Sequence, residues 1–219
     1  MATKLNKNMI NQQINSINHA PNVIRYTKNI DINKNKYKVE LVTEASNIRN
    51  QVERFTYDSY VKHFDAHLTA FFPIILTVIR VSDNKIISAL GLRYADIDSL
   101  FSECYLAEPI EKLIIHNNQH KIDRKRIIEL GNFVVSKNSD VNRVMPIISK
   151  YIKSLDVEWA IYTLTKPIKS FFDAFNVELC LLGQANKEAV NGAANDWGKY
   201  YDFKPAVYYS NVKNNMNEA

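Results

Sequence analysis

Apolar and polar residues follow two rhythms along the chain, one with the two-residue period of strands and one with the period of helices. Alternating or β-branched runs, the pattern typical of strands, occur in these segments: Tyr37–Val42, Pro73–Val81, Ile86–Tyr94, Ile127–Val135, Trp159–Leu164, Leu179–Leu182 and Ala206–Tyr209. Apolar residues three and four positions apart indicate helices in four others: Ile48 to Tyr60, Pro109 to Ile114, Val144 to Leu155, and Pro167 to Phe175.

The order of these elements is strand, helix, hairpin, helix, strand, helix, strand, helix, strand, strand. This order predicts an α/β protein with a mixed, mostly antiparallel sheet flanked by helices. Pro146 lies inside the third predicted helix, and a proline in a helix interior removes a backbone hydrogen bond. We therefore expect this helix to start near Arg143 or to kink at Pro146.

The two ends of the chain differ from its middle. Residues 1–36 are rich in Asn, Lys and Ile without a sustained period, which predicts a flexible basic arm with at most a short helix over Met9–Ile17. Residues 37–212 form the predicted domain, and residues 213–219 a polar tail. Because the arm lacks an apolar face, we expect its deletion to leave the melting temperature nearly unchanged.

The net charge of +5 belongs to the arm. Residues 1–38 hold seven Lys or Arg residues and one acid, which leaves 21 bases and 22 acids in the rest of the chain. A nearly neutral domain without a recognition motif argues against nucleic acid as a partner.

The sequence predicts a cytoplasmic protein with reduced thiols. Cys104 and Cys180 belong to no CxxC or metal-spaced group, so they do not indicate a disulfide framework. The N-terminus lacks the apolar core of a signal peptide. The longest apolar run, Ala70–Ile79, is interrupted by Pro73, whereas a membrane-spanning helix needs about 20 apolar residues.

Metal binding is not expected. His63 and His67 have helical spacing, as do His116 and His120, but neither pair has the glutamate of an HExxH motif. Phosphate-binding glycine loops and a serine nucleophile elbow are also missing from the sequence.

The segment Glu129-Leu130-Gly131-Asn132 carries the main candidate chemistry. In a regular strand, residues three apart face opposite sides of the sheet. A glycine within a strand often marks a bulge, which adds one residue and resets the register. A bulge at Gly131 therefore predicts that Glu129 and Asn132 point into one cleft. The alternative is that Glu129 is a structural carboxylate, capped by a nearby backbone or by Arg93.

Five segments in one order resemble the thermostable hemolysin family of bacterial proteins. They are YVKHFDAHLTAFFP (60–73), ALGLRYA with LFSECYLAEPIE (89–95 and 100–111), IIELGNF (127–133), YTLTKPIKSFFDAFNVE (162–178) and NDWGKYYDFKPAV (195–207). The family's fold is similar to that of the GNAT N-acyltransferases and of the acyl-homoserine-lactone synthases. The resemblance implies a slot for a pantetheine arm between Ile127–Val135 and Trp159–Leu164.

The expected donor is an acyl thioester, on coenzyme A or on an acyl-carrier protein. GNAT enzymes hold the cofactor pyrophosphate on a glycine-rich loop ahead of a helix, but Ser136–Arg143 contains no glycine. Arg143 could meet a phosphate there, whereas Asp140 would repel one. A carrier-linked donor, which has a single phosphate to place, suits this loop better than coenzyme A.

The expected chemistry is acyl transfer to an amine. A partly buried glutamate has a raised pKa and can accept the amine proton, directly or through water; Glu129 is the first candidate for base or orienter, and Glu103 the second. Arg93 could anchor a substrate carboxylate or phosphate, or form an ion pair with one of these glutamates. Asn132 would position the thioester carbonyl.

An aromatic cluster and a threonine are further candidates for the substrate site. Trp197, Tyr200 and Tyr201 form an aromatic cluster that either lines an acyl or substrate pocket or packs in the core. Thr163 could hydrogen-bond a substrate carbonyl, or be an ordinary strand threonine.

The sequence therefore favours a fatty acyltransferase acting on a small amine-bearing acceptor, with peripheral membrane contact as a further expectation. Two alternatives remain: a hemolysin that acts directly on cells, and a binding protein that kept the fold without the chemistry. Charged strand residues such as Arg80 do not suit a lipid-facing barrel. We expect any lytic activity to come from an amphiphilic product.

Overall fold

A computed structural model describes residues 36–118, 122–190 and 196–214. All of them belong to one unit, Asp31–Ala219. The predicted basic arm, with its short helix over Met9–Ile17, and most of the polar tail lie outside the described residues.

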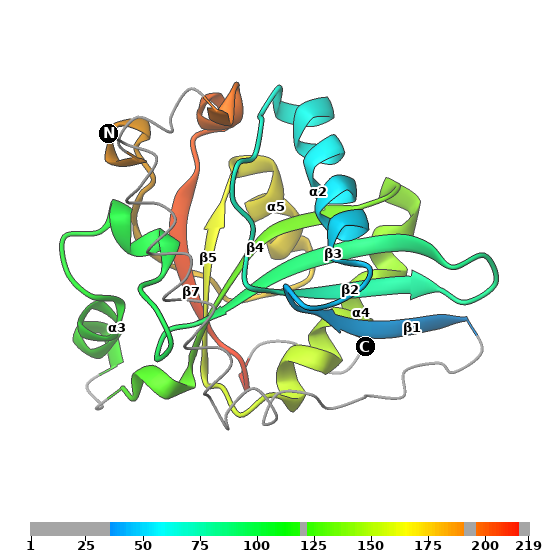
Figure 1. Cartoon of the computed structure of the whole chain (residues 1–219). Helices are drawn as coiled ribbons and strands as arrows, with labels where there is room; N and C mark the ends of the chain where they lie inside the picture. Colours follow the sequence, from blue (N-terminus) through cyan, green and yellow to red (C-terminus); the bar gives the residue numbers. More distant parts are fainter. Residues whose placement is uncertain (1–35, 119–121, 191–195, 215–219) are drawn as a thin grey trace. The chain divides into compact units, whose positions relative to one another are not determined.

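A single sheet organises the described part of the chain (Figure 1). Its strands are β1 (Tyr37–Val42), β2 (Ile74–Arg80), β3 (Lys85–Tyr94), β4 (Ile127–Val135), β5 (Trp159–Leu164), β6 (Cys180–Gln184) and β7 (Ala206–Asn211). They lie in the order β1-β2-β3-β4-β5-β7-β6. Neighbours are antiparallel except β4 and β5, which are parallel. This confirms the predicted mixed, mostly antiparallel sheet.

Within the described residues, four α-helices pack on the sheet: α2 (Arg49–Phe64), α3 (Ile110–Asn118), α4 (Val141–Ser154) and α5 (Lys166–Ala174). α4 begins two residues before the predicted start and keeps Pro146 inside it. The proline lacks the N–H that would bond the carbonyl of Asn142 in the first turn. Because Asn142 and Pro146 are both exposed, water can satisfy that carbonyl.

Alternating strand residues face two separate layers of helix. Ile75 and Ile79 of β2 share a core cluster with Val52 and Tyr60 of α2, so α2 covers one face. A second cluster joins α3 to β4, β5 and β7. α4 and α5 lie behind the sheet in Figure 1, and the ring of Phe172 in α5 meets that of Tyr162 in β5.

The parallel strands β4 and β5 separate halfway along. Their pairing runs from Ile127 with Trp159 to Leu130 with Tyr162 and goes no further, although β4 continues to Val135 and β5 to Leu164. The sheet is therefore split between its helix layers, and the split opens at the segment that carries Gly131 and Asn132.

Candidate active site

A β-bulge shapes the split. In the β3–β4 ladder, Ala89 pairs with Val134 but Gly91 pairs with Gly131, so β4 contains one extra residue opposite Leu90. Asn132 takes up the change with a left-handed backbone, φ 49°, a conformation that asparagine tolerates better than most residues. The prediction of a bulge at Gly131 is wrong by one residue, because Gly131 itself pairs regularly.

The ring of Phe72 explains why glycine precedes the bulge. A Cβ atom would lie 2.5 Å from Phe72 Cζ at Gly131 and 2.4 Å from Phe72 Cγ at Gly91. These glycines are direct partners in the ladder, so the ring lies across the bare strand pair. Arg49 fixes this segment by donating to the carbonyl oxygen of Phe72 at 2.8 Å. Sequence reasoning missed Phe72, although paired glycines inside two strands are a signal of close approach.

Three adjoining cavities follow the split. The slot cavity, of about 110 Å³, runs through the split from Tyr60 and Phe64 of α2 to the helices α4 and α5. Its walls are mainly apolar and include Leu130, Met145, Ile148, Leu164, Ile168 and Phe172. On the α2 side of the sheet lie a middle cavity of about 40 Å³ and an aromatic cavity of about 140 Å³.

The three cavities meet at Asn132, which lines each of them. Glu129, Asn132 and Thr163 line the middle cavity together with Tyr60, Phe101, Trp197 and Tyr200. The aromatic cavity includes Phe71, Phe72, Arg93, Phe101 and Trp197. Glu129 and Asn132 thus share one cavity, the arrangement expected of a bulged strand.

Glu129 is held from one side by backbone alone. Its side chain is almost fully buried, and its two oxygens accept from the N–H groups of Phe101 at 2.9 Å and Ser102 at 2.7 Å. These donors begin the short 3₁₀ helix η2 (Phe101–Tyr105). Burial raises the pKa of Glu129, while the nearby Arg93 and the two N–H groups oppose the rise. Glu129 therefore anchors a loop and is also one of the residues that line the middle cavity.

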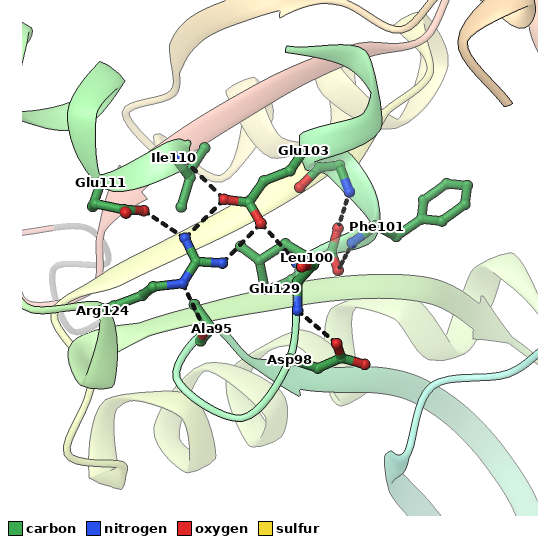
Figure 2. A network of polar contacts seen from close by, with 11 residues as sticks. Ala95, Asp98, Leu100, Phe101, Glu103, Ile110, Glu111, Arg124 and Glu129 are labelled. Carbon is green, nitrogen blue, oxygen red and sulfur yellow. Dashed lines mark hydrogen bonds and ion pairs between the residues drawn. The ribbon is translucent and has the colours of Figure 1, made fainter. Parts of the chain in front are cut away.

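Glu103 belongs to η2 itself, and its carboxylate lies in a network of ions (Figure 2). Its carboxylate accepts two bonds of 2.8 Å from Arg124 and further bonds from the N–H groups of Leu100 and Ile110. Arg124 also pairs with Glu111. Burial raises the pKa of Glu103, but Arg124 and the N–H donors outweigh it, so the net shift is downward.

Arg93 and Arg143 occupy contrasting places. Arg93 lies over the ring of Phe72, 5.1 Å from its centroid, and lines the aromatic cavity. The ion pair predicted as its alternative role is not formed with any glutamate of the described segments. Arg143 is largely exposed, pairs with Asp140 at 3.1 Å and lines none of the three cavities. The pairing follows from their spacing, because residues three apart are neighbours on a helix.

The aromatic cluster both packs and lines the site. Tyr200 is buried beside Tyr60 and Phe64, whereas Trp197 stacks on Phe101 at 5.8 Å and lines two cavities. Tyr201 bonds the hydroxyl of Tyr105 at 2.8 Å and lines neither.

Thr163 carries a hydroxyl that faces the split. Its Oγ1 atom is buried, has no hydrogen-bond partner among the described residues and belongs to a residue that lines the slot and middle cavities. An unpaired buried hydroxyl is costly, so a bound substrate that supplies a partner would recover that cost.

Two distant segments join to form this wall. His67 N donates to the carbonyl oxygen of Asp196 at 2.6 Å, and Lys199 N donates to that of Phe64 at 2.7 Å. Between them, Gly198 has φ 48°, and a Cβ atom there would lie 2.2 Å from the carbonyl oxygen of Asp65. The glycine therefore lets the 196–200 segment dock on the end of α2 and positions Trp197.

The described residues contain no group of three or more His, Cys, Asp or Glu side chains able to hold a metal ion. His120 lies outside them. No helix in the described ranges is long and apolar enough to cross a membrane.

Known structures share this architecture. The acyl-homoserine-lactone synthase LasI matches with a TM-score of 0.51 at 8% identity, over 80% of this chain and 90% of that one. The CoA-dependent acyl-homoserine lactone synthase MesI gives 0.50 at 20% identity, over 80% and 89%. FeeM, an N-acyl amino acid synthase from uncultured soil microbes, gives 0.50 at 12% identity, over 81% and 93%. At these identities the likeness establishes the fold, which confirms the predicted GNAT-like acyltransferase architecture.

Sequence comparison gives the family. A search among curated proteins finds no match. The model of the thermostable hemolysin family matches residues 42–216, which include every strand of the sheet except most of β1. The protein therefore belongs to the thermostable hemolysin family.

Proposed function

We propose that this protein transfers a fatty acyl group from a thioester donor to an amine-bearing acceptor. The observation that carries the proposal is the meeting of unlike cavities at the split between β4 and β5. The slot cavity, which reaches α4 and α5, is mainly apolar, as an acyl chain requires. The cavities on the α2 side are lined by the charged residues Glu129 and Arg93, among others.

The donor would enter along the split. Beyond Leu130 the edge of β4 no longer pairs with β5, so its backbone can bond an amide-bearing pantetheine arm as it would an added strand. The segment from Ser136 to the first turn of α4 has no glycine, and Arg143 in that turn already pairs with Asp140. This combination favours the single phosphate of an acyl-carrier protein over the pyrophosphate of coenzyme A.

The reaction joins an amine nitrogen to the thioester carbonyl carbon. The amine lone pair attacks, the C–N bond forms, the C–S bond breaks, and sulfur leaves as a thiolate that becomes a thiol on gaining the proton that nitrogen loses. Glu129 would accept this proton through a water, since its cavity of about 40 Å³ exceeds the roughly 15 Å³ that one water needs. Asn132 and Thr163 would position the thioester carbonyl.

Glu103 is left out of this mechanism. Its oxygens are engaged by Arg124 and by two backbone N–H groups, and its lowered pKa makes it a weak base. We propose that Glu103 is a structural anchor for η2 instead. Arg143 is retained as a contact for the donor phosphate.

The test is thiol release by the purified protein, given acyl-carrier protein or coenzyme A thioesters and a mixture of amines. The expected result is free thiol in step with an N-acyl product detected by mass spectrometry. Ile168→Trp, which would fill the half-buried mouth of the slot cavity, should lower the longest chain accepted, whereas Ile168→Leu should not. If neither thiol nor product is formed with either donor, the alternative of a non-catalytic binding protein would be favoured.

Hemolysis would follow from the product. An N-acylated polar acceptor is an amphiphile and can disturb a membrane without insertion of the protein. Purified lipid-free protein should therefore leave dye-loaded vesicles intact, while an extract of its product should release the dye. Rapid leakage caused by the protein itself, unaffected by Glu129→Gln, would favour direct lysis.

A further inference from the structure

We propose that the aromatic cavity is the acceptor site, and that it binds an α-amino acid with an apolar side chain through the carboxylate. This inference rests on the proposed acyl transfer and specifies its acceptor. The product would then be an N-acyl amino acid, formed by the C–N bond formation and thiol release described above.

Arg93 supplies a cation that no described residue pairs with. The guanidinium of Arg93 lies over the ring of Phe72 and forms no hydrogen bond or ion pair with the residues that the structure describes. Every other half-buried or buried arginine in the described domain has an anionic partner: Arg49, Arg80, Arg124 and Arg126. Arginine's planar fork matches a carboxylate with two parallel bonds, so a ligand carboxylate would complete the set.

The position of Glu129 also supports this inference. Arg93 and Glu129 are direct partners in the β3–β4 ladder, so their side chains leave the same face of the sheet about 5 Å apart at Cβ. A cation for the ligand carboxylate and an acceptor for its amine protons thus lie side by side. An α-amino acid carries its carboxylate and its amine on one carbon, so the two groups can reach the neighbouring side chains of Arg93 and Glu129.

The charge around the cavity favours a zwitterion over a phosphate. Besides Arg93, the lining contains the carboxylate of Asp196, and Glu129 lies in the adjoining middle cavity. Two nearby acids oppose a dianion, whereas they tolerate a ligand whose amine offsets its carboxylate. For the same reason, aspartate and glutamate should be poor ligands.

The walls set the ligand side chain. Leu68, Phe71, Phe72, Phe101 and Trp197 make most of the lining apolar. Its volume of about 140 Å³ is close to the roughly 150 Å³ of an engineered cavity that takes up benzene. The cavity therefore suits leucine or phenylalanine better than glycine or a long amine.

Binding can be tested without catalysis. Equilibrium dialysis of the wild-type protein against radiolabelled L-phenylalanine needs no variant, with unlabelled L-phenylalanine, L-phenylalaninamide, 2-phenylethylamine and L-glutamate as competitors. L-phenylalanine should compete about tenfold to a hundredfold better than its amide or the decarboxylated amine, as expected for a lost charge-assisted pair. Equal competition by the amide would overturn the inference.

Arg93 itself is tested by a matched pair of variants. Arg93→Gln should abolish the advantage of L-phenylalanine over its amide, and Arg93→Lys, which keeps the charge, should retain part of it. Circular dichroism would verify that both are folded. An unchanged advantage in a folded Arg93→Gln protein would overturn the assignment of Arg93.

Rates of acylation separate this inference from the proposed function. If amines are acylated equally with and without a carboxylate, the acyl transfer stands and the acceptor inference falls. If L-phenylalanine binds with the expected preference but no amine is acylated by either donor, the site stands and the proposed reaction falls.

Discussion

Two carboxylates fix the short helix η2, Glu129 from strand β4 and Glu103 from within the helix, and they differ in their own partners. Glu103 is paired with the guanidinium of Arg124 and with two backbone N–H groups, whereas Glu129 accepts from two backbone N–H groups and only feels the charge of the unpaired Arg93. The pKa of Glu103 is lowered, and that of Glu129 is raised by burial. A structural carboxylate can act as a base when its nearest cation does not pair with it, because desolvation then exceeds the stabilisation of the charge.

Replacing the proposed base, Glu129, should have the largest effect, which is on the rate. Glu129→Gln should lower the rate of thiol release about 100-fold or more, since it removes the proton acceptor and turns an amide NH₂ toward the N–H of Phe101 or Ser102. Glu103→Gln is the matched control and should change the rate less than about threefold per folded molecule, because an anchor does not touch the reacting atoms. Equal losses in the two variants would contradict the division of roles.

The next effect is on stability and concerns the counter-ion. Arg124→Met should lower the free energy of unfolding by about 2–3 kcal/mol, because it leaves Glu103 and Glu111 without their shared cation; the figure lies below that of a fully buried pair, since all three side chains are partly exposed. Urea denaturation measures the change. Lys125→Met, at the exposed neighbouring position, should have an effect within about 0.5 kcal/mol, and a similar loss in both variants would count against the network.

The pH dependence of stability should have opposite signs for the two carboxylates. Glu103, whose folded pKa is lowered, contributes stability above the ordinary glutamate pKa of about 4.3 that is lost as pH falls. Glu129, whose folded pKa is raised, contributes stability below about 4.3 that is lost as pH rises through its folded pKa. Urea midpoints from pH 3 to 8 should therefore show the cost of Glu103→Gln growing with pH and the cost of Glu129→Gln shrinking. Parallel trends would show that the surroundings do not shift the pKa values of the two carboxylates in opposite directions.

Replacing Arg93 should have the smallest effect, a shift in the pH–rate profile. Its positive charge opposes the rise in the pKa of Glu129, so Arg93→Gln should move the acid limb of the pH–rate profile to higher pH. Arg143→Gln removes a cation that pairs with Asp140 outside the cavities and should leave that limb where it is. A profile that is the same in all three proteins would mean that Glu129 does not set the limb.

The fold could be predicted from the sequence because periodicity is local. β1, β4 and β5 begin and end at the predicted residues, and the strands and helices occur in the predicted order. The site depends on contacts that periodicity does not encode. The partners of Glu129 are main-chain groups 27 and 28 residues away, which no side-chain pattern reveals. From the sequence, Glu103 is a reasonable candidate base, but in the structure Arg124, 21 residues later in the chain, pairs with it.

The bulge shows a finer limit of sequence reasoning. Glycine and asparagine both tolerate a left-handed backbone, so Gly131-Asn132 offers two places for one irregularity. Only the ring of Phe72, some sixty residues earlier, decides between them, because it requires a bare strand at Gly131 and leaves the bulge to Asn132.

We expect Phe72, Gly91 and Gly131 to change together in evolution. Any β-carbon at either glycine collides with the ring, so drift at one of these positions requires a compensating change at another. Phe72→Ala would vacate room for alanine at 91 or 131, and each glycine change alone should be deleterious. In a collection of relatives, these three alignment columns should covary, and the covariation would locate the split in members whose structures are unknown.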